Sequence, residues 1–182
     1  MKKLFSIVAC MALAMTFMTS CKDKNTPVNP PVPDTKPVAA GMKFTATFDT
    51  LTIQMCDISF DYYDEKGQKK NEAVNATVWK KVIKSEALPA TFGFHWNLAV
   101  KANLDTTKFD HFIVDYNFSY ESVALNAAGE AVTAPQGAAF SNSINMAMSK
   151  REATVQAILN HNPVNFLHKY DAEGKVEVVD WQ

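Results

Sequence analysis

The chain has 182 residues, of which 18 are Lys or Arg and 19 are Asp or Glu, so its formal net charge at pH 7 is −1. The basic residues are spread among acidic ones and form no cluster that could neutralise a phosphate backbone, which argues against a nucleic-acid partner. Hydrophobic residues make up 47% of the chain, enough for the core of a single domain.

The N-terminus has the features of an export signal. Lys2 and Lys3 are followed by an apolar stretch over residues 4–18, which is too short and too poorly flanked to remain as a membrane-spanning helix. The stretch ends in the run Met18-Thr19-Ser20-Cys21, in which small residues directly precede a cysteine.

This run resembles the lipobox of bacterial lipoproteins. The resemblance implies that residues 1–20 are a signal peptide and that Cys21 carries fatty acyl chains such as palmitate, which would anchor the protein to a membrane of the bacterial cell envelope. Lys22 and Asp23 differ from the double aspartate that retains lipoproteins at the inner membrane, which favours the outer membrane. Whether the domain would face the periplasm or the exterior stays open.

Residues 21–41 are expected to form the lipidated cysteine and a semi-rigid tether. Proline cannot donate a hydrogen bond to a sheet ladder, and proline-rich segments favour extended conformations. Five of the 8 prolines of the chain fall in this segment, namely Pro27, Pro30, Pro31, Pro33 and Pro37.

Alternating apolar and polar residues dominate from Met42 onward and predict β-strands. Residues 42–48 form the first such run. The apolar positions of the expected strand that follows, which ends near Tyr63, change from 51, 53 and 55 to 58, 60 and 62, and this change of parity around Cys56 and Asp57 predicts a β-bulge. A turn is expected at 64–67, and a further strand over residues 74–84.

The longest alternations span residues 92–104 and 112–120. If these two strands form a hairpin with Leu104 facing Phe112, the same register places Lys101 opposite Asp115, which is a favourable cross-strand pair. The sequence therefore predicts that the two strands are neighbours in one sheet.

The C-terminal third is expected to contain one short helix among strands. Ser149 and Glu152 have the spacing of a capping box, so a helix near 150–160 that ends before Pro163 is predicted, although residues 153–159 also alternate as a strand would. The remaining expected elements are turns at 126–129 and 171–174, a strand over 137–148, and a closing hairpin of 166–170 with 175–181.

These elements predict a single β-rich domain over residues 42–182. Its expected fold is a mainly antiparallel β-sandwich of about 7–9 strands, and a closed β-barrel is the alternative.

The sequence contains no arrangement typical of a catalytic or metal site. His95 and His111 are expected on the polar faces of neighbouring strands, where they could flank a metal or a haem, but no spacing typical of a metal module accompanies them. Cys56 has no basic neighbour that would favour a thiolate. We therefore expect no catalytic residue, no metal ligand and no cofactor.

Exposed aromatic residues are the remaining candidates for ligand binding. Tyr63 and Trp181 end predicted strands, and Trp79 is out of phase with the apolar positions before it. Together with neighbouring polar residues they would suit stacking against sugars. The alternative for Trp79 is that it packs inward.

The expected function is that of a non-enzymatic, lipid-anchored binding or assembly module with a protein or glycan ligand. One alternative is a small-ligand or glycan carrier, in which Trp96, Tyr116 and Phe118 would line an interior cavity. A hydrolase is the third possibility, and it would require polar side chains that converge in a cleft.

Overall fold

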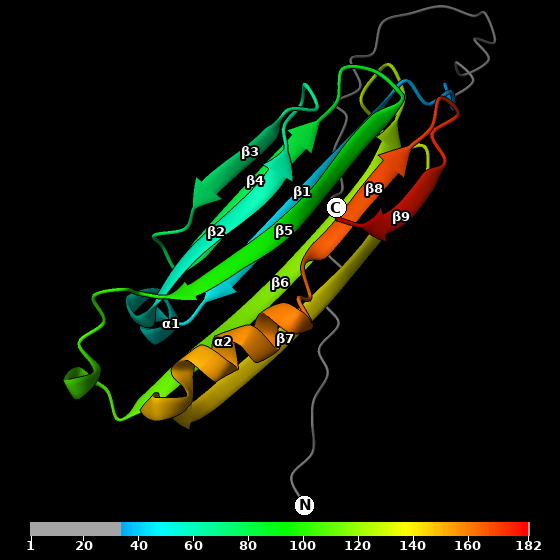
Figure 1. Cartoon of the computed structure of the whole chain (residues 1–182). Helices are drawn as coiled ribbons and strands as arrows, with labels where there is room; N and C mark the ends of the chain where they lie inside the picture. Colours follow the sequence, from blue (N-terminus) through cyan, green and yellow to red (C-terminus); the bar gives the residue numbers. More distant parts are fainter. Residues whose placement is uncertain (1–33, 182) are drawn as a thin grey trace, which may run out of the picture. The chain divides into compact units, whose positions relative to one another are not determined.

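Two antiparallel β-sheets pack face to face in the computed structural model, which describes residues 34–181 (Figure 1). The strands are β1 (Ala39–Phe48), β2 (Cys56–Tyr63), β3 (Lys69–Ala73), β4 (Val78–Lys84), β5 (Ala90–Val100), β6 (His111–Leu125), β7 (Gln136–Ala147), β8 (Asn165–Tyr170) and β9 (Val176–Asp180). The helices are α1 (Thr50–Met55) and α2 (Arg151–Asn160), with short 3₁₀ turns at Thr106–Lys108 and Met148–Lys150. The expected signal peptide, Cys21 and residues 22–33 of the expected tether lie outside the described residues.

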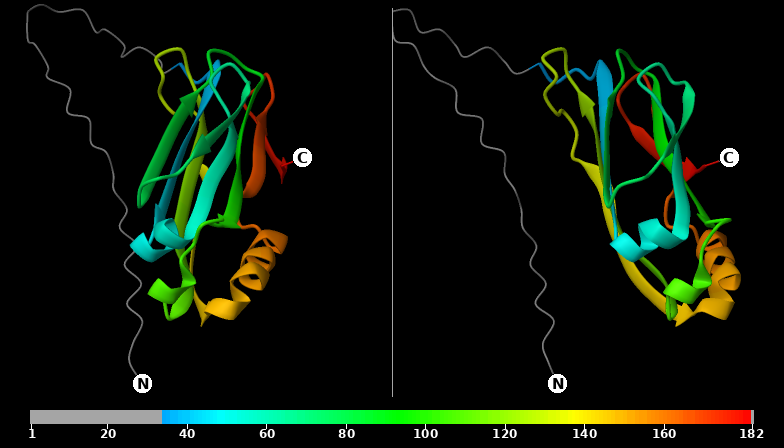
Figure 2. Two further views of the ribbon diagram at one scale, coloured as in Figure 1. Left: turned by 60° about the vertical axis from the view of Figure 1, so that its left-hand side comes forward. Right: turned by 90° about the vertical axis from the view of Figure 1, so that its left-hand side faces the viewer.

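The strand order confirms the predicted β-sandwich. The four-stranded sheet has the order β4-β1-β6-β7, and the five-stranded sheet has the order β3-β2-β5-β8-β9. The described strands belong to two separate sheets rather than to one closed barrel. Figure 2 shows the two layers from the side, with α2 below the five-stranded sheet, beside the long ends of β6 and β7.

The core between the sheets is built mainly from aromatic rings. Strand residues alternate between the core and the outside, so each sheet contributes one apolar face. Phe44 of β1 is 1% exposed and stacks on Phe94 of β5 with ring centroids 4.3 Å apart. Other fully or nearly fully buried core rings are Phe60, Phe92, Trp96, Phe112 and Phe118.

The predicted hairpin of residues 92–104 with 112–120 is wrong, because β5 and β6 belong to different sheets. The residues between Val100 and His111 cross from one sheet to the other and include a 3₁₀ turn. Lys101 therefore does not face Asp115 across a ladder. Its Nζ instead donates to the backbone carbonyl of Ile53 at 2.7 Å.

The parity change before Cys56 comes from a helix and not from the expected β-bulge. The Asp49 side chain accepts a hydrogen bond from the N–H of Leu51 at 2.7 Å and so caps the N-terminus of α1. The helix lets the chain leave β1 in one sheet and enter β2 in the other, which is why the apolar positions change from one parity to the next.

Three further boundaries differ from the expectation. Strand β1 begins at Ala39, so the last residues assigned to the tether belong to the sheet. The expected strand over 74–84 is shorter, because β4 begins at Val78, and β3 was not expected. Helix α2 is confirmed, but the capping box at Ser149 is wrong, since Lys150 occupies the N-cap position and makes no side-chain hydrogen bond there.

Among residues 34–181, no helix combines the length and the apolar character needed to cross a membrane.

Candidate functional site

The outer face of the five-stranded sheet brings two of the predicted ligand-binding residues together. The strand register places Asp61 of β2 opposite His95 of β5, and His95 opposite Asn165 of β8. The N–H of Trp181 donates to the carbonyl of Asn165, which extends the same row past the end of β9. Tyr63 lies on the same face of β2 as Asp61, since the two are separated by one residue.

Three rings on this face form a group that we call the outer aromatic cluster, made of Tyr63, His95 and Trp181. The ring centroids of Tyr63 and Trp181 are 5.0 Å apart, and those of His95 and Trp181 are 6.2 Å apart. The Nζ of Lys69 lies 5.2 Å from the centroid of the Trp181 ring. All three rings are half-buried, so each combines a fixed position with access to solvent.

Polar side chains beside the cluster are held by hydrogen bonds to one another. Asp61 accepts from the amide groups of Asn71 at 2.8 Å and Asn97 at 3.3 Å. His95 Nδ1 hydrogen-bonds Asn165 Oδ1 at 2.9 Å. The face therefore offers carboxylate, amide and imidazole groups next to flat rings, in positions that are set before any ligand arrives.

A hollow of about 650 Å³ adjoins Tyr63, and we call it the polar hollow. Its floor includes outward-facing residues of β5 and β8, among them Thr91 and Lys169. Its walls are the turn over residues 64–67 and the segment over 85–90. The volume lies in the range of about 300–1,000 Å³ that is typical of small-ligand sites.

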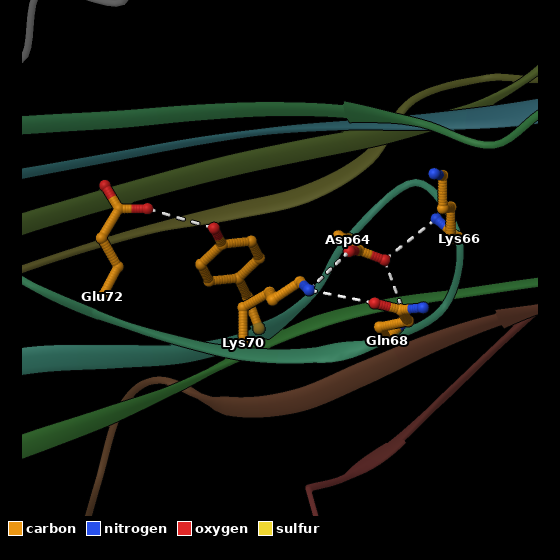
Figure 3. A network of polar contacts seen from close by, with 6 residues as sticks. Asp64, Lys66, Gln68, Lys70 and Glu72 are labelled. Atoms are coloured by element: carbon orange, nitrogen blue, oxygen red, sulfur yellow. Dashed lines mark hydrogen bonds and ion pairs between the residues drawn. The ribbon is translucent and has the colours of Figure 1, made fainter.

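The turn that forms one wall of the polar hollow is held by Asp64 (Figure 3). Asp64 Oδ1 accepts from the backbone N–H of Gln68 at 2.8 Å and of Lys66 at 3.0 Å, while Oδ2 lies 3.3 Å from Lys70 Nζ. The hydrogen bond from Gln68 is the main reason why the pKa of Asp64 is lowered. The wall is thus fixed by contacts within the β2–β3 hairpin.

Trp79 does not belong to this surface, which corrects its assignment as a ligand-binding residue. It is 8% exposed and stacks on Phe60 in the core with centroids 4.8 Å apart. Its Nε1 donates to Glu72 Oε1 at 2.8 Å, and Glu72 also pairs with Lys81. The hydrogen bond from Lys81 is the largest cause of the lowered pKa of Glu72. Trp79 thus packs inward and links the edge strands β3 and β4.

The rings proposed to line a carrier's cavity pack against one another. Trp96 and Phe118 have centroids 4.9 Å apart, as do Tyr116 and Phe118. Tyr116 also borders a separate groove of about 450 Å³ between β7 and α2. The indole N–H of Trp96 is buried and has no hydrogen-bond partner among the described residues.

The other candidate groups lie apart from the outer aromatic cluster. His111 begins β6, in the sheet that does not contain His95, so the two histidines are not on neighbouring strands. Burial raises the pKa of the Cys56 thiol to about 12, which keeps it protonated. Within residues 34–181, no group of three or more His, Cys, Asp or Glu side chains could hold a metal ion.

A buried serine–histidine contact lies between the sheets. Tyr170 donates its hydroxyl to Ser122 Oγ at 2.7 Å, and Ser122 Oγ lies 2.7 Å from His168 Nδ1. Ser122 is 0% exposed and His168 is 1% exposed, so both side chains are closed off from solvent. The contact therefore acts as a structural hydrogen bond in the core.

Acid should destabilise the protein through His168. Burial lowers the pKa of His168 to about 4, whereas an unfolded histidine titrates at about 6.5. The unfolded state then binds more protons than the folded state between these values, so the free energy of unfolding falls as the pH falls below 6.5. We expect His168 to account for a loss of about 2 kcal/mol between pH 7 and pH 5.

The matched variant is His168→Asn, which keeps an acceptor for Ser122 but does not titrate. Urea unfolding at both pH values should show a pH dependence that is smaller by about 2 kcal/mol in the variant than in the wild type. Equal pH dependence in the two proteins would mean that His168 is not buried in its neutral form.

The comparisons with protein-family models, with curated proteins and with solved structures each find no match. The function is therefore inferred from the geometry of the described residues. Of the three aromatic residues singled out in the sequence, Tyr63 and Trp181 lie together and Trp79 does not. Sequence patterns do not assign His95, Asn165 or Lys69 to this site, because only the strand order places them beside Trp181.

Proposed function

We propose that this chain is a non-enzymatic, lipid-anchored binding module of the bacterial envelope, and that its ligand is a glycan held on the outer face of the five-stranded sheet. The lipobox resemblance at Cys21 supports the anchor, and Lys22 and Asp23, which differ from the double aspartate of inner-membrane retention, favour the outer membrane. The outer aromatic cluster supports the glycan, because the close approach of Tyr63 and Trp181 beside fixed polar groups is the single observation that carries this function.

The chemistry of a sugar matches both parts of this surface. One face of a pyranose ring presents C–H groups, which pack on aromatic rings, while its hydroxyl groups both donate and accept hydrogen bonds. Asp61 and Asn97 are adjacent acceptor and donor groups, and Lys169 in the polar hollow adds a cationic donor. A ligand that extends from the cluster into the hollow would reach Lys169 as well as the rings.

Glycan binding is tested with the full chain, purified in detergent, against immobilised neutral and uronic-acid oligosaccharides. Aromatic contacts contribute about 0.5–1.5 kcal/mol beyond the area that they bury, so Trp181→Ala and Tyr63→Ala should each weaken binding at least about tenfold. Tyr63→Phe should retain most of the affinity, since it keeps the ring.

The control is Val82→Ala, which changes a 72%-exposed residue on β4 of the other sheet. It should bind like the wild type. Binding that survives the loss of both rings, or the absence of binding to every oligosaccharide, would refute the proposed function. Thermal unfolding of each variant separates a lost contact from a lost fold.

A further inference from the structure

Strand β7 is an edge strand without the protection that the other edges have. It pairs with β6, and no described strand pairs with its other side. Its twelve residues, QGAAFSNSINMA, include no charge and no proline. Charged residues on an edge discourage association with other strands. The other three edge strands carry them: Lys69, Lys70 and Glu72 in β3, Lys80, Lys81 and Lys84 in β4, and Glu177 and Asp180 in β9.

The hydrogen bonds around β6 show which backbone groups of β7 face the free edge. Asp115 lies opposite Ser143. The N–H of Asp115 donates to Thr52 Oγ1 at 2.8 Å and its carbonyl accepts from the N–H of Asp49 at 3.2 Å, so both groups point away from β7. In an antiparallel ladder, two residues that lie opposite each other either both direct their N–H and C=O groups toward the partner strand or both direct them away. The backbone groups of Ser143 therefore point away from β6. Accordingly, the N–H of Ser143 donates to the side chain of Asn142 at 2.9 Å.

The odd-numbered residues of β7 therefore present N–H and C=O groups to a further strand, and its even-numbered residues share the inner face of the sheet. Phe140 and Ile144 on that face are half-buried, and Met146 is 36% exposed. Ile144 and Met146 line the groove of about 450 Å³, whose other wall is α2. An added strand would both complete the ladder and cover these apolar side chains.

We propose that the occupant of this edge is β7 of a second copy of the chain, paired antiparallel about a twofold axis at Asn142. In this register Phe140 faces Ile144 of the second copy, and Ala138 faces Met146. Aromatic residues opposite β-branched residues are favourable cross-strand pairs. A register centred on Ser141 would instead place Phe140 opposite Asn142. A shift of the second copy's strand by one residue would turn its apolar side chains to the outer face of the sheet.

The absence of charge favours a second copy over a different protein. A strand without charged residues has no electrostatic means of selecting one partner among many. Pairing of a strand with itself needs no such selection, because a twofold interface uses the same patch on both molecules. The four-stranded sheet would then continue through both copies.

The test uses charges placed on the twofold axis, where each chain meets its own residue. The full chain in detergent is expected to sediment as a dimer. Asn142→Lys and Asn142→Asp would each place like charges in direct opposition, and each should raise the dissociation constant of the dimer at least about 30-fold. An equimolar mixture of the two variants should restore dimers, because the introduced ammonium and carboxylate groups attract each other. The control, Val82→Lys on edge strand β4, should leave the dimer intact.

A disulfide provides a second measurement at the same position. Asn142 is exposed and would lie in a non-hydrogen-bonded pair, where Cα atoms are about 4.5 Å apart and a disulfide fits. Oxidised Asn142→Cys protein should therefore run as a covalent dimer, and the wild type with its own cysteines should not. A wild-type monomer, or a dimer that Asn142→Lys leaves unchanged, overturns the proposal. Glycan binding by a monomer would leave the proposed function standing without it.

Discussion

Replacing Phe44 with alanine is expected to lower the free energy of unfolding by about 4 kcal/mol. Phe44 lies at the centre of the sandwich, where its ring contacts partners from both sheets. The ring centroids of Phe60 and Phe94 lie 5.2 Å and 4.3 Å from it, and Trp79 and Phe118 follow at 5.9 Å and 6.1 Å. The alanine variant loses the free energy gained by transferring the ring from water into the core. It also leaves a cavity, which the surrounding strands cannot fill without breaking contacts with their own neighbours.

Phe109→Ala is the matched control, because Phe109 is a half-buried phenylalanine in the segment after the 3₁₀ turn at Thr106–Lys108. Its removal should cost about 1 kcal/mol, since fewer core atoms lose contact. Equilibrium unfolding in guanidinium chloride measures both values. If the two variants are equally stable, the aromatic rings packed around Phe44 are not the main source of stability.

Gly93→Ala should cost at least about 3 kcal/mol, although it adds a single methyl group. A Cβ at position 93 would lie 2.2 Å from the carbonyl oxygen of Phe166 and 2.9 Å from the Cα of Leu167. Both are backbone atoms of β8. Strand β5 is the central strand of its sheet, paired with β2 on one side and β8 on the other, so it cannot move away from either without breaking a ladder.

Gly137→Ala provides the comparison. Its Cβ would also lie 2.2 Å from a backbone oxygen, that of Tyr120, but Gly137 is the second residue of β7, so this end of the strand can shift without breaking the rest of its ladder. We expect a cost of about 1 kcal/mol for this variant. Thermal unfolding of the two alanine variants should therefore show a much lower midpoint for Gly93→Ala, and a reversed order would contradict the role given to Gly93.

The sequence predicts the faces of the strands better than their partners. The alternation over residues 92–104 identifies β5 and its buried side correctly. The same alternation is compatible with any neighbour that has a matching apolar face, so it could not exclude a hairpin with β6 or reveal pairing with β2 and β8. Strand β3 was not predicted, because the alternation of apolar and polar residues that identifies a strand is absent from its charged sequence KKNEA.

For the candidate site too, the sequence identifies single residues but not which of them lie together. Tyr63 and Trp181 are separated by more than half of the chain. Each lies at the end of a predicted strand and beside polar residues, which identifies it as a candidate. Their contact depends on the order β2-β5-β8-β9, in which only β5 and β8 lie between β2, which ends at Tyr63, and β9, which ends one residue before Trp181. Trp79 has a similar sequence context, but its ring points into the core because it shares the inward-facing parity of β4 with Ile83.

The pairing of β1 with β6 has a consequence for how the protein forms. Ala39 of β1 lies opposite Leu125 of β6, so the ladder between these two central strands cannot form until most of the chain has been synthesised. Ladders between such distant segments carry a large loop-closure cost, and β-sandwiches with this connectivity fold over milliseconds to seconds rather than microseconds. A polypeptide that folds slowly remains unfolded for longer, which would suit the proposed lipoprotein precursor, because such a chain would cross a membrane before its domain folds.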